Sequence, residues 1–363
     1  MIFKIFIDNN IHFDRFSILM YFTKKYNLLK KYNIEIVNDY QQSQLILFLV
    51  SNKMNLINLD KKYNYIFKTE IPIILLEIQD SGLSWVREFN QIKNIKAVFK
   101  NYKVKPNELQ NTEHTYYGKY HYYQIHKAYQ VEKLELIDEE EDIGIKYYPK
   151  NKQLAKISSE NLEKFMFVLW DFHNSPLCQK LSMKYFRFNQ INFNKTIDIF
   201  CVNKLKINNF IDAHCQKAKL IVESLKSKYN VITQNLKKQE YEEIFSKCKI
   251  AISCWELGEW VHMDGYAMYA GAILIKPNSD HIKMYPDIYR SNQTYIPCAH
   301  DYSDLNEIIE NILKNYNKYI PMIKENRKFI LKINEENTAN LFWQKVLKVM
   351  GINPKKQQEC LFT

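Results

Sequence analysis

The sequence has few of the features that mark several large protein classes. It has only 7 glycines in 363 residues, where about 7% would be average, and it has no Gly/Ser-rich linker and no internal repeat. No apolar run approaches the ~20 residues of a membrane-spanning helix. The apolar start, residues 1–7, is too short for a secretory signal. We therefore expect a soluble cytoplasmic protein (in the host cytoplasm for a viral chain) with no integral membrane segment.

The cysteines form no recognisable framework. There are 7 of them, without a C-x-x-C pair and without a histidine at zinc spacing. An odd number in such a pattern is typical of reduced, buried thiols in a cytosolic protein.

Charge and hydrophobic content indicate a folded protein with a basic surface. The chain is 46% hydrophobic and 14% aromatic, which argues against disorder, and its length suits two domains. Its formal net charge is +11, but lysines are spread along the chain without a block of five or more positive charges. This favours a solvated basic surface over a nucleic-acid site, which we keep as an alternative. Such a surface attracts anionic partners, including sugar nucleotides and acidic membranes at their periphery.

Short apolar runs alternate with helical patterns in two parts of the chain. In the first part we expect strands over 2–7, 34–37, 45–50, 71–78 and 97–99 and a helix over 16–29. In the second we expect strands over 197–202, 231–233, 249–254, 272–275 and 295–298 with helices between them. This alternation predicts an α/β protein with two doubly wound domains, over 1–165 and 190–335. Residues 110–153, rich in Tyr and His and then in acids, form an insertion in the first domain.

Residues 249–289 are the most informative stretch. They predict a buried strand, a loop with Trp255, Gly258 and Glu259, a helix from about Val261 to Gly271, and a second buried strand. Parallel sheets bind ligands beyond the carboxyl ends of their strands, where this loop should lie. A helix N-terminus suits a phosphate, and a carboxylate suits sugar hydroxyls. Together they fit a sugar nucleotide.

The segments WELGEWVHMD (255–264), AGAILIKP (270–277), PDIY (286–289) and YIP (295–297) carry a resemblance. They resemble the donor-binding half of GT-B glycosyltransferases of the exostosin-like and family 1 type, over about forty residues. Glu256, Met263 and Tyr266 depart from the pattern of that family. The resemblance implies two Rossmann-like domains facing across a cleft, with the acceptor on the first and the donor on the second. It also implies that a helix within 336–363 crosses back to the first domain and precedes a tail.

The same resemblance assigns roles in donor binding. Lys276, the loop amides near Gly258, and Arg187 and Lys204 beside the second domain's first strand would contact the diphosphate; the alternative is ordinary surface charge. The remaining donor-side candidates are Glu259 for the sugar, Trp255 for the base, Tyr266 for the ribose and Asp264 in the first turn of the helix. For these the alternatives are helix-start acids and core packing.

In an inverting enzyme, the catalytic base would be an Asp, Glu or His of the first domain that faces the cleft. Asp8, Glu77 and Asp80 follow or end expected strands there, and stereochemistry stays open. No D-x-D motif occurs, which agrees with the metal-independent mechanism that the resemblance implies. No cofactor is expected, and the donor is a substrate, UDP- or GDP-linked.

The sequence thus predicts a glycosyltransferase, hexosyl or pentosyl, that transfers a sugar from a nucleotide donor to a glycan, glycoprotein or other hydroxyl acceptor, in glycan biosynthesis or protein glycosylation. The alternatives are a catalytically degenerate GT-B-like protein that binds glycan or nucleotide, and a nucleic-acid-binding protein. We expect Glu259→Ala and Lys276→Ala to lose turnover and keep the fold.

Overall fold

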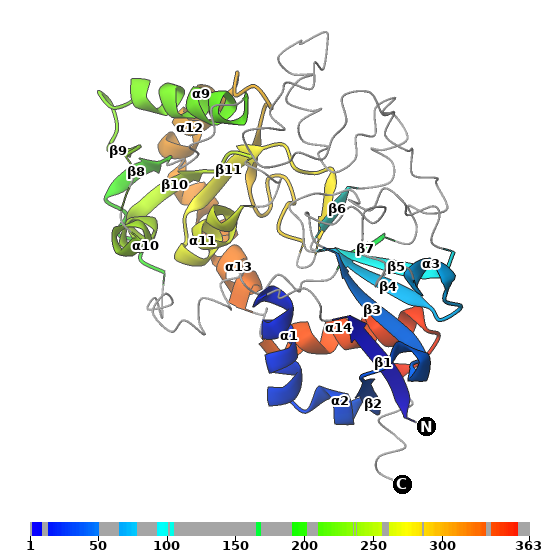
Figure 1. The fold of residues 1–363 in the computed structure, drawn as a ribbon. Coiled ribbons are helices and arrows are strands. Elements are labelled where there is room, and N and C mark those ends of the chain that lie inside the picture. The colour runs from blue at the N-terminus through cyan, green and yellow to red at the C-terminus, as the bar shows by residue number, and fades with distance from the viewer. Residues whose placement is uncertain are drawn as a thin grey trace, which may run out of the picture.

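The computed structural model forms two α/β domains built on parallel sheets (Figure 1). The residues it describes are 2–8, 14–50, 65–77, 93–100, 102–104, 165–167, 191–201, 210–234, 236, 238–255, 261–284, 287–331 and 335–354.

The first sheet has six parallel strands in the order β2-β1-β3-β4-β5-β7. Its strands are β1 (Phe3–Asp8), β2 (Ile34–Val37), β3 (Leu45–Val50), β4 (Ile73–Glu77), β5 (Ile95–Lys100) and β7 (Phe165–Phe167). The central strands are continuous apolar runs such as LILFLV in β3, as expected when both faces of a parallel sheet are covered.

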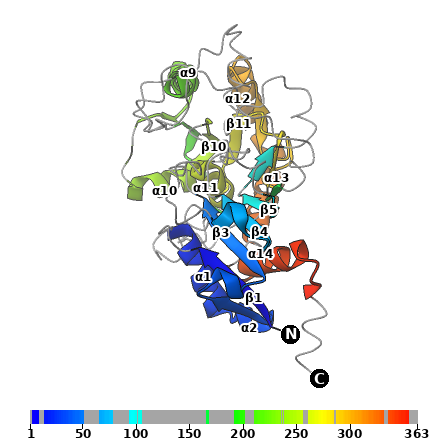
Figure 2. The same cartoon turned by 45° about the vertical axis from the view of Figure 1, so that its right-hand side comes forward.

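Helices from both ends of the chain cover one face of this sheet. They are α1 (Asp14–Lys25), α2 (Leu28–Lys31) and α14 (Glu335–Val349), and the short η1 (Tyr40–Gln42) and α3 (Tyr65–Lys68) complete the described elements of this domain. The helix expected over 16–29 is two helices, because Asn27 adopts a left-handed conformation with φ of 53° between them. Figures 1 and 2 both show α14 lying against the first sheet.

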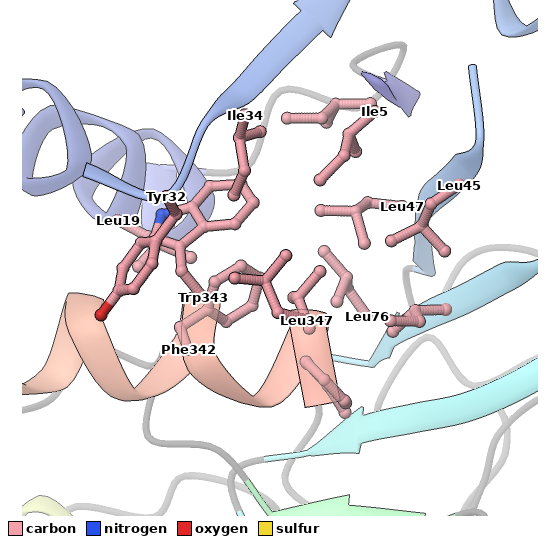
Figure 3. Packing of buried hydrophobic residues seen from close by; sticks show 14 of the residues in the cluster. Ile5, Leu19, Tyr32, Ile34, Leu45, Leu47, Leu76, Phe342, Trp343 and Leu347 are labelled. Carbon is pink, nitrogen blue, oxygen red and sulfur yellow. The ribbon is translucent and has the colours of Figure 1, made fainter. Parts of the chain in front are cut away.

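The last helix completes the core of the first domain (Figure 3). Phe342, Trp343 and Leu347 of α14 pack with Ile5 and Leu47 of the central strands. The indole Nε1 of Trp343 donates a hydrogen bond of 2.8 Å to Thr23 Oγ1, so even the polar atom of this side chain is satisfied.

The second sheet has five parallel strands in the order β13-β11-β10-β8-β9. Its strands are β8 (Ile197–Phe200), β9 (Val231–Ile232), β10 (Cys248–Ile252), β11 (Ile273–Pro277) and β13 (Ile296–Cys298). Helices α9 (Phe210–Ser224) and α12 (Leu305–Lys314) pack on one face, and α10 (Lys238–Lys247) and α11 (His262–Ala270) on the other. The segment η5 (Tyr316–Tyr319) leads into α13 (Ile320–Leu331), which packs against α11.

Both sheets repeat one topology. Read from β2 and from β9, the first five strands follow the order 2-1-3-4-5 of a doubly wound fold, with a switch point between the first and third strands. The predicted α/β class with two Rossmann-like domains is therefore confirmed. The cleft and the domain boundaries stay predictions. In the described part of the chain, no helix is long and apolar enough to cross a membrane.

A small antiparallel sheet connects the two domains. Strand β6 (Tyr102–Val104) follows β5 of the first domain and pairs with β12 (Ile282–Met284) of the second. Figure 1 shows the yellow β12 beside β6.

The C-terminal end of α11 is held by two buried cations. Lys195 Nζ donates to the carbonyl oxygens of Ser246 and Ala270, at 2.9 and 3.1 Å, and Arg327 donates to the carbonyl oxygen of Tyr269 at 2.6 Å. These carbonyls lie at helix ends, where positive charge is favourable. Burial lowers the pKa of Lys195 to about 8.

Gly271 ends α11 in a left-handed conformation, with φ of 76°. A Cβ atom there would lie 2.6 Å from Ile191 Cγ2, whereas at Gly351, with φ of 71°, it would meet nothing within 4 Å. We predict that Gly351→Ala costs about 1–2 kcal/mol through backbone strain alone. Gly271→Ala should cost about 3 kcal/mol or more, because the clash adds to that strain. Urea denaturation of both variants would check this, and equal losses would contradict the role given to Ile191.

Candidate functional site

The predicted strand–loop–helix–strand unit is β10, α11 and β11. Strand β10 lies next to β8, so its carboxyl end is at the switch point of the second sheet, where doubly wound folds bind ligands. Ser253, Cys254 and Trp255 follow β10 and are buried. Helix α11 begins after Val261, so its N-terminus lies at the same edge.

A buried ion pair joins this helix to the next strand. Lys276 Nζ of β11 lies 3.1 Å from Asp264 Oδ2 of α11, and both side chains are 0% exposed. The ammonium also donates to Ser253 Oγ at 3.2 Å and to the Cys254 carbonyl at 3.3 Å. Its three N–H groups thus have three acceptors, as a buried ammonium requires.

The carboxylate of Asp264 is held mainly through one oxygen. Oδ2 accepts hydrogen bonds from the Tyr289 hydroxyl and, at 3.3 Å, from the backbone N–H of Val261. The Lys276 ammonium also lies 5.8 Å from the centre of the Tyr289 ring. Within the described residues, Oδ1 of Asp264 has no hydrogen-bond partner. The ion pair is therefore anchored through Oδ2 of Asp264, and it holds the first turn of α11 in place.

Trp255 lies in a buried aromatic cluster at the same edge. Its Nε1 donates to Ser279 Oγ at 3.1 Å. Its ring centre is 4.9 Å from that of His300, 5.6 Å from that of His281 and 6.5 Å from that of His214. Trp255 is 0% exposed and its ring contacts the rings of these histidines in this structure, and its stacking on a base stays a prediction.

Tyr266, predicted to meet a ribose, lies on the packing side of α11. Its ring is stacked 5.9 Å from that of Phe245 in α10, and the side chain is half-buried. Met263 is 4% exposed and belongs to the same core cluster. Two of the three departures from the motif, Met263 and Tyr266, thus contribute to the packing of α11, and the contact of Tyr266 with a ribose stays a prediction.

The corresponding edge of the first sheet carries charged residues. Asp8 ends β1 at the switch point and is buried; its Oδ2 accepts a 2.6 Å hydrogen bond from the Tyr65 hydroxyl. The Tyr65 ring is stacked on that of Tyr40, 4.5 Å between centres. Glu77 ends β4 and is paired in register with Lys100, which is 0% exposed. Asp8 and Glu77 thus share one edge, as predicted for parallel strand ends.

The other predicted site residues lie outside the described residues; they are Asp80, Arg187, Lys204, Gly258 and Glu259. In the sequence, Gly258 and Glu259 lie between Trp255 and Val261. Among the described residues, no group of three or more His, Cys, Asp or Glu side chains could hold a metal ion.

Sequence reasoning missed three parts of this site. Ser253 had no motif to mark it, Tyr289 lies in the PDIY segment but was given no role of its own, and Lys100 follows an expected strand but was not considered. The histidines could have been found, because His281 and His300 each follow a strand, β11 or β13, within a few residues.

The five described cysteines are buried and free, as predicted for them. Burial raises the pKa of the Cys201 and Cys298 thiols, which lie at the ends of β8 and β13. They stay protonated at neutral pH and are therefore poor nucleophiles. Burial likewise raises the pKa of Tyr295, so its hydroxyl keeps its proton.

No protein-family model matches the chain, and no curated protein sequence matches it. Solved structures resemble it weakly. Anabaena HepE in complex with UDP-glucose has a TM-score of 0.44 at 11% identity, covering 96% of this chain and 100% of HepE. The pneumococcal O-GlcNAc transferase GtfA, with UDP and GlcNAc, has 0.37 at 11%, covering 76% and 57%.

A putative UDP-N-acetylglucosamine 2-epimerase from Listeria monocytogenes has a TM-score of 0.39 at 8% identity, covering 97% of each chain. The present chain spans only 57% of the length of GtfA. At such identities and TM-scores, the likeness transfers no activity to this chain.

The ion pair leads to a stability prediction. Asp264→Asn or Lys276→Met leaves one buried charge without its partner and should lower the free energy of unfolding by about 3–5 kcal/mol. The same reasoning changes the expectation that Lys276→Ala keeps the fold. The double variant should lose less than the sum of the two, because it leaves no unpaired charge.

The measurement is urea denaturation of the two single variants and the double. The control is Glu325→Gln, which breaks a 3.3 Å ion pair with Lys328 whose side chains are 70% and 66% exposed, and which should leave the midpoint unchanged. Additive losses in the double variant would contradict the coupling.

Proposed function

We propose that this chain is a glycosyltransferase of the GT-B type, using a nucleotide-sugar donor without a metal ion. The observation that supports this best is the unit β10–α11–β11. It brings the N-terminus of α11 to the switch point of the second sheet, and the motif residues Gly258 and Glu259 connect the two. The assignment to the exostosin-like or family 1 type is part of the same proposal.

The donor would lie beyond the carboxyl ends of β8 and β10. Backbone N–H groups at the start of α11 would face the diphosphate, apart from those of Val261 and Asp264, which are bonded within the turn. Glu259 would accept hydrogen bonds from sugar hydroxyls. Lys276 and Asp264 would act indirectly, because their buried ion pair fixes the position of the first turn of the helix. Arg187 and Lys204 would neutralise the negative charge of the leaving nucleotide, which is UDP or GDP.

The acceptor hydroxyl would bind at the edge of the first sheet. Asp8 is the first choice for the base, ahead of Glu77 and Asp80, because it is a buried strand-end carboxylate at the switch point and is held by Tyr65. In an inverting reaction the acceptor oxygen bonds to the anomeric carbon while the bond to the phosphate oxygen breaks. Asp8 takes the hydroxyl proton, and the nucleotide leaves with the bonding electrons.

The donor is tested by thermal unfolding of the EDTA-treated protein with UDP, GDP, CMP and their sugar conjugates. A nucleotide at 100 times its dissociation constant adds about 2.7 kcal/mol of stability, which raises the melting temperature measurably. Glu259→Gln should reduce the shift with the sugar conjugate more than the shift with the free nucleotide, since Glu259 contacts the sugar.

The matched control is Glu336→Gln, the same change at an exposed position of α14 on the first domain. It should leave both shifts intact. If no nucleotide raises the melting temperature, the donor-site proposal fails. A shift that requires added Mg²⁺ or Mn²⁺ would remove the metal-independent part alone.

The second candidate is a degenerate GT-B-like protein that binds a nucleotide or glycan without transferring sugar. The packing of Tyr266 on Phe245 and the burial of Met263 favour it, because both residues serve the core of α11. It predicts a thermal shift without transfer or donor hydrolysis. The nucleic-acid alternative predicts an affinity that falls steeply with salt.

A further inference from the structure

The segment between β11 and β13, which we term the connector, is described over residues 278–284 and 287–295. The connector supplies hydrogen-bond partners to two buried side chains of the candidate site, Trp255 and Asp264. Ser279 Oγ accepts the Trp255 indole N–H, and the Tyr289 hydroxyl donates to Asp264 Oδ2. Each contact therefore joins a side chain of the candidate site to a residue of the connector.

The two ends of the connector are fastened to each other. The Tyr295 hydroxyl accepts from the backbone N–H of Ser279 at 2.8 Å. The Asp280 carboxylate accepts from the hydroxyls of Ser291 and Tyr295, at 2.5 and 3.2 Å. The two ends of the connector are therefore held together by side-chain hydrogen bonds.

The middle of the connector is paired with the first domain. Ile282, Lys283 and Met284 of β12 lie opposite Val104, Lys103 and Tyr102 of β6. One residue separates β6 from β5, a strand of the first sheet. Backbone hydrogen bonding from the first domain thus reaches the segment that carries Tyr289.

We propose that Tyr289 is a positioning residue of the candidate donor site, and that the first domain holds it in place through the β6–β12 strand pair. The first domain thereby sets the geometry of the first turn of α11, through β6, the connector, Tyr289 and Asp264 in turn. Within this chain, the donor site is complete only when the two domains are paired. The nucleotide part of this inference rests on the proposed function, whereas the structural coupling does not.

The strand pairing is tested by a disulfide. Residues directly opposite in antiparallel strands have Cα atoms about 4.5–5.5 Å apart, within the range of a disulfide. Lys103→Cys with Lys283→Cys should therefore form a bridge on mild oxidation, identified by peptide mass. Each single variant, treated in the same way, is the control for the native thiols. Failure of the double variant to form the bridge would overturn the proposal.

The coupling is tested by hydrogen exchange of the amides of residues 261–264. The backbone N–H of Asp264 donates to the Val261 carbonyl at 3.0 Å and reports on this turn. Lys103→Pro breaks the middle of the strand pair, because proline lacks the N–H and cannot adopt a typical strand φ. Exchange at 261–264 should become about tenfold faster than in Lys103→Ala, which keeps the backbone donor.

Tyr289→Phe should have the same effect on these amides, about tenfold, because it removes one hydrogen bond to a charged carboxylate. The matched control is Tyr316→Phe, since the Tyr316 hydroxyl is buried and has no hydrogen-bond partner among the described residues. Equal exchange at 261–264 in Lys103→Pro and Lys103→Ala, or in Tyr289→Phe and Tyr316→Phe, would overturn the proposal.

Calorimetric binding of UDP and GDP separates this inference from the proposed function. If the wild type binds one of them, Tyr289→Phe should weaken binding about tenfold, and Tyr316→Phe should not. Undiminished binding by Tyr289→Phe overturns the positioning role. If the wild type binds neither nucleotide, the proposed function fails, and the exchange comparison still decides whether the domains are coupled.

Discussion

The buried contact between Asp264 and Lys276 is the constraint on which the second domain depends. It lies where β10, α11 and β11 meet, and the ammonium also fastens Ser253 and Cys254 at the end of β10. Taking two charges out of water is costly, so the pair is stable only while each partner keeps its hydrogen bonds. Any movement of α11 against β11 must break this pair, which makes the helix and the strand one rigid body.

The two sheets share one topology but differ in what their carboxyl edges hold. The carboxyl edge of the second sheet holds the Asp264–Lys276 ion pair, whose charges cancel, and Trp255 among histidines. A ligand at this edge would therefore interact mainly with backbone dipoles and aromatic surfaces. The first edge holds Asp8 and Lys100, buried charges at strand ends. In the function proposed above, proton transfer is therefore assigned to the first edge and phosphate recognition to the second. This division of chemistry arises from strand ends alone.

Much of the fold follows from local sequence. Strands 34–37 and 45–50 were predicted to the residue, because polar clusters bound their apolar runs. The break at Asn27 escaped prediction, since the apolar spacing continues through it. The pairing of β6 with β12 also escaped, because three-residue strands far apart in the sequence leave no periodic signal.

The site was predictable in place but less so in role. Strand periodicity and the motif located Trp255, Asp264 and Lys276 at one edge of the sheet. Their burial was not foreseen, because a sequence does not show that the Lys276 ammonium turns back toward α11 instead of out to a ligand. Tyr289 illustrates the same limit, since its role depends on how a long segment folds back onto the helix.

The position of α14 has a consequence for biosynthesis. Phe342, Trp343 and Leu347 fill the core beneath the first sheet, yet the ribosome adds them after the whole second domain. At about 5–20 residues per second, the first sheet waits many seconds with one apolar face incompletely covered. During that interval it is exposed to chaperones and to aggregation. The second domain must therefore be synthesised before the first domain can become fully native, although the strands of the first domain are made first.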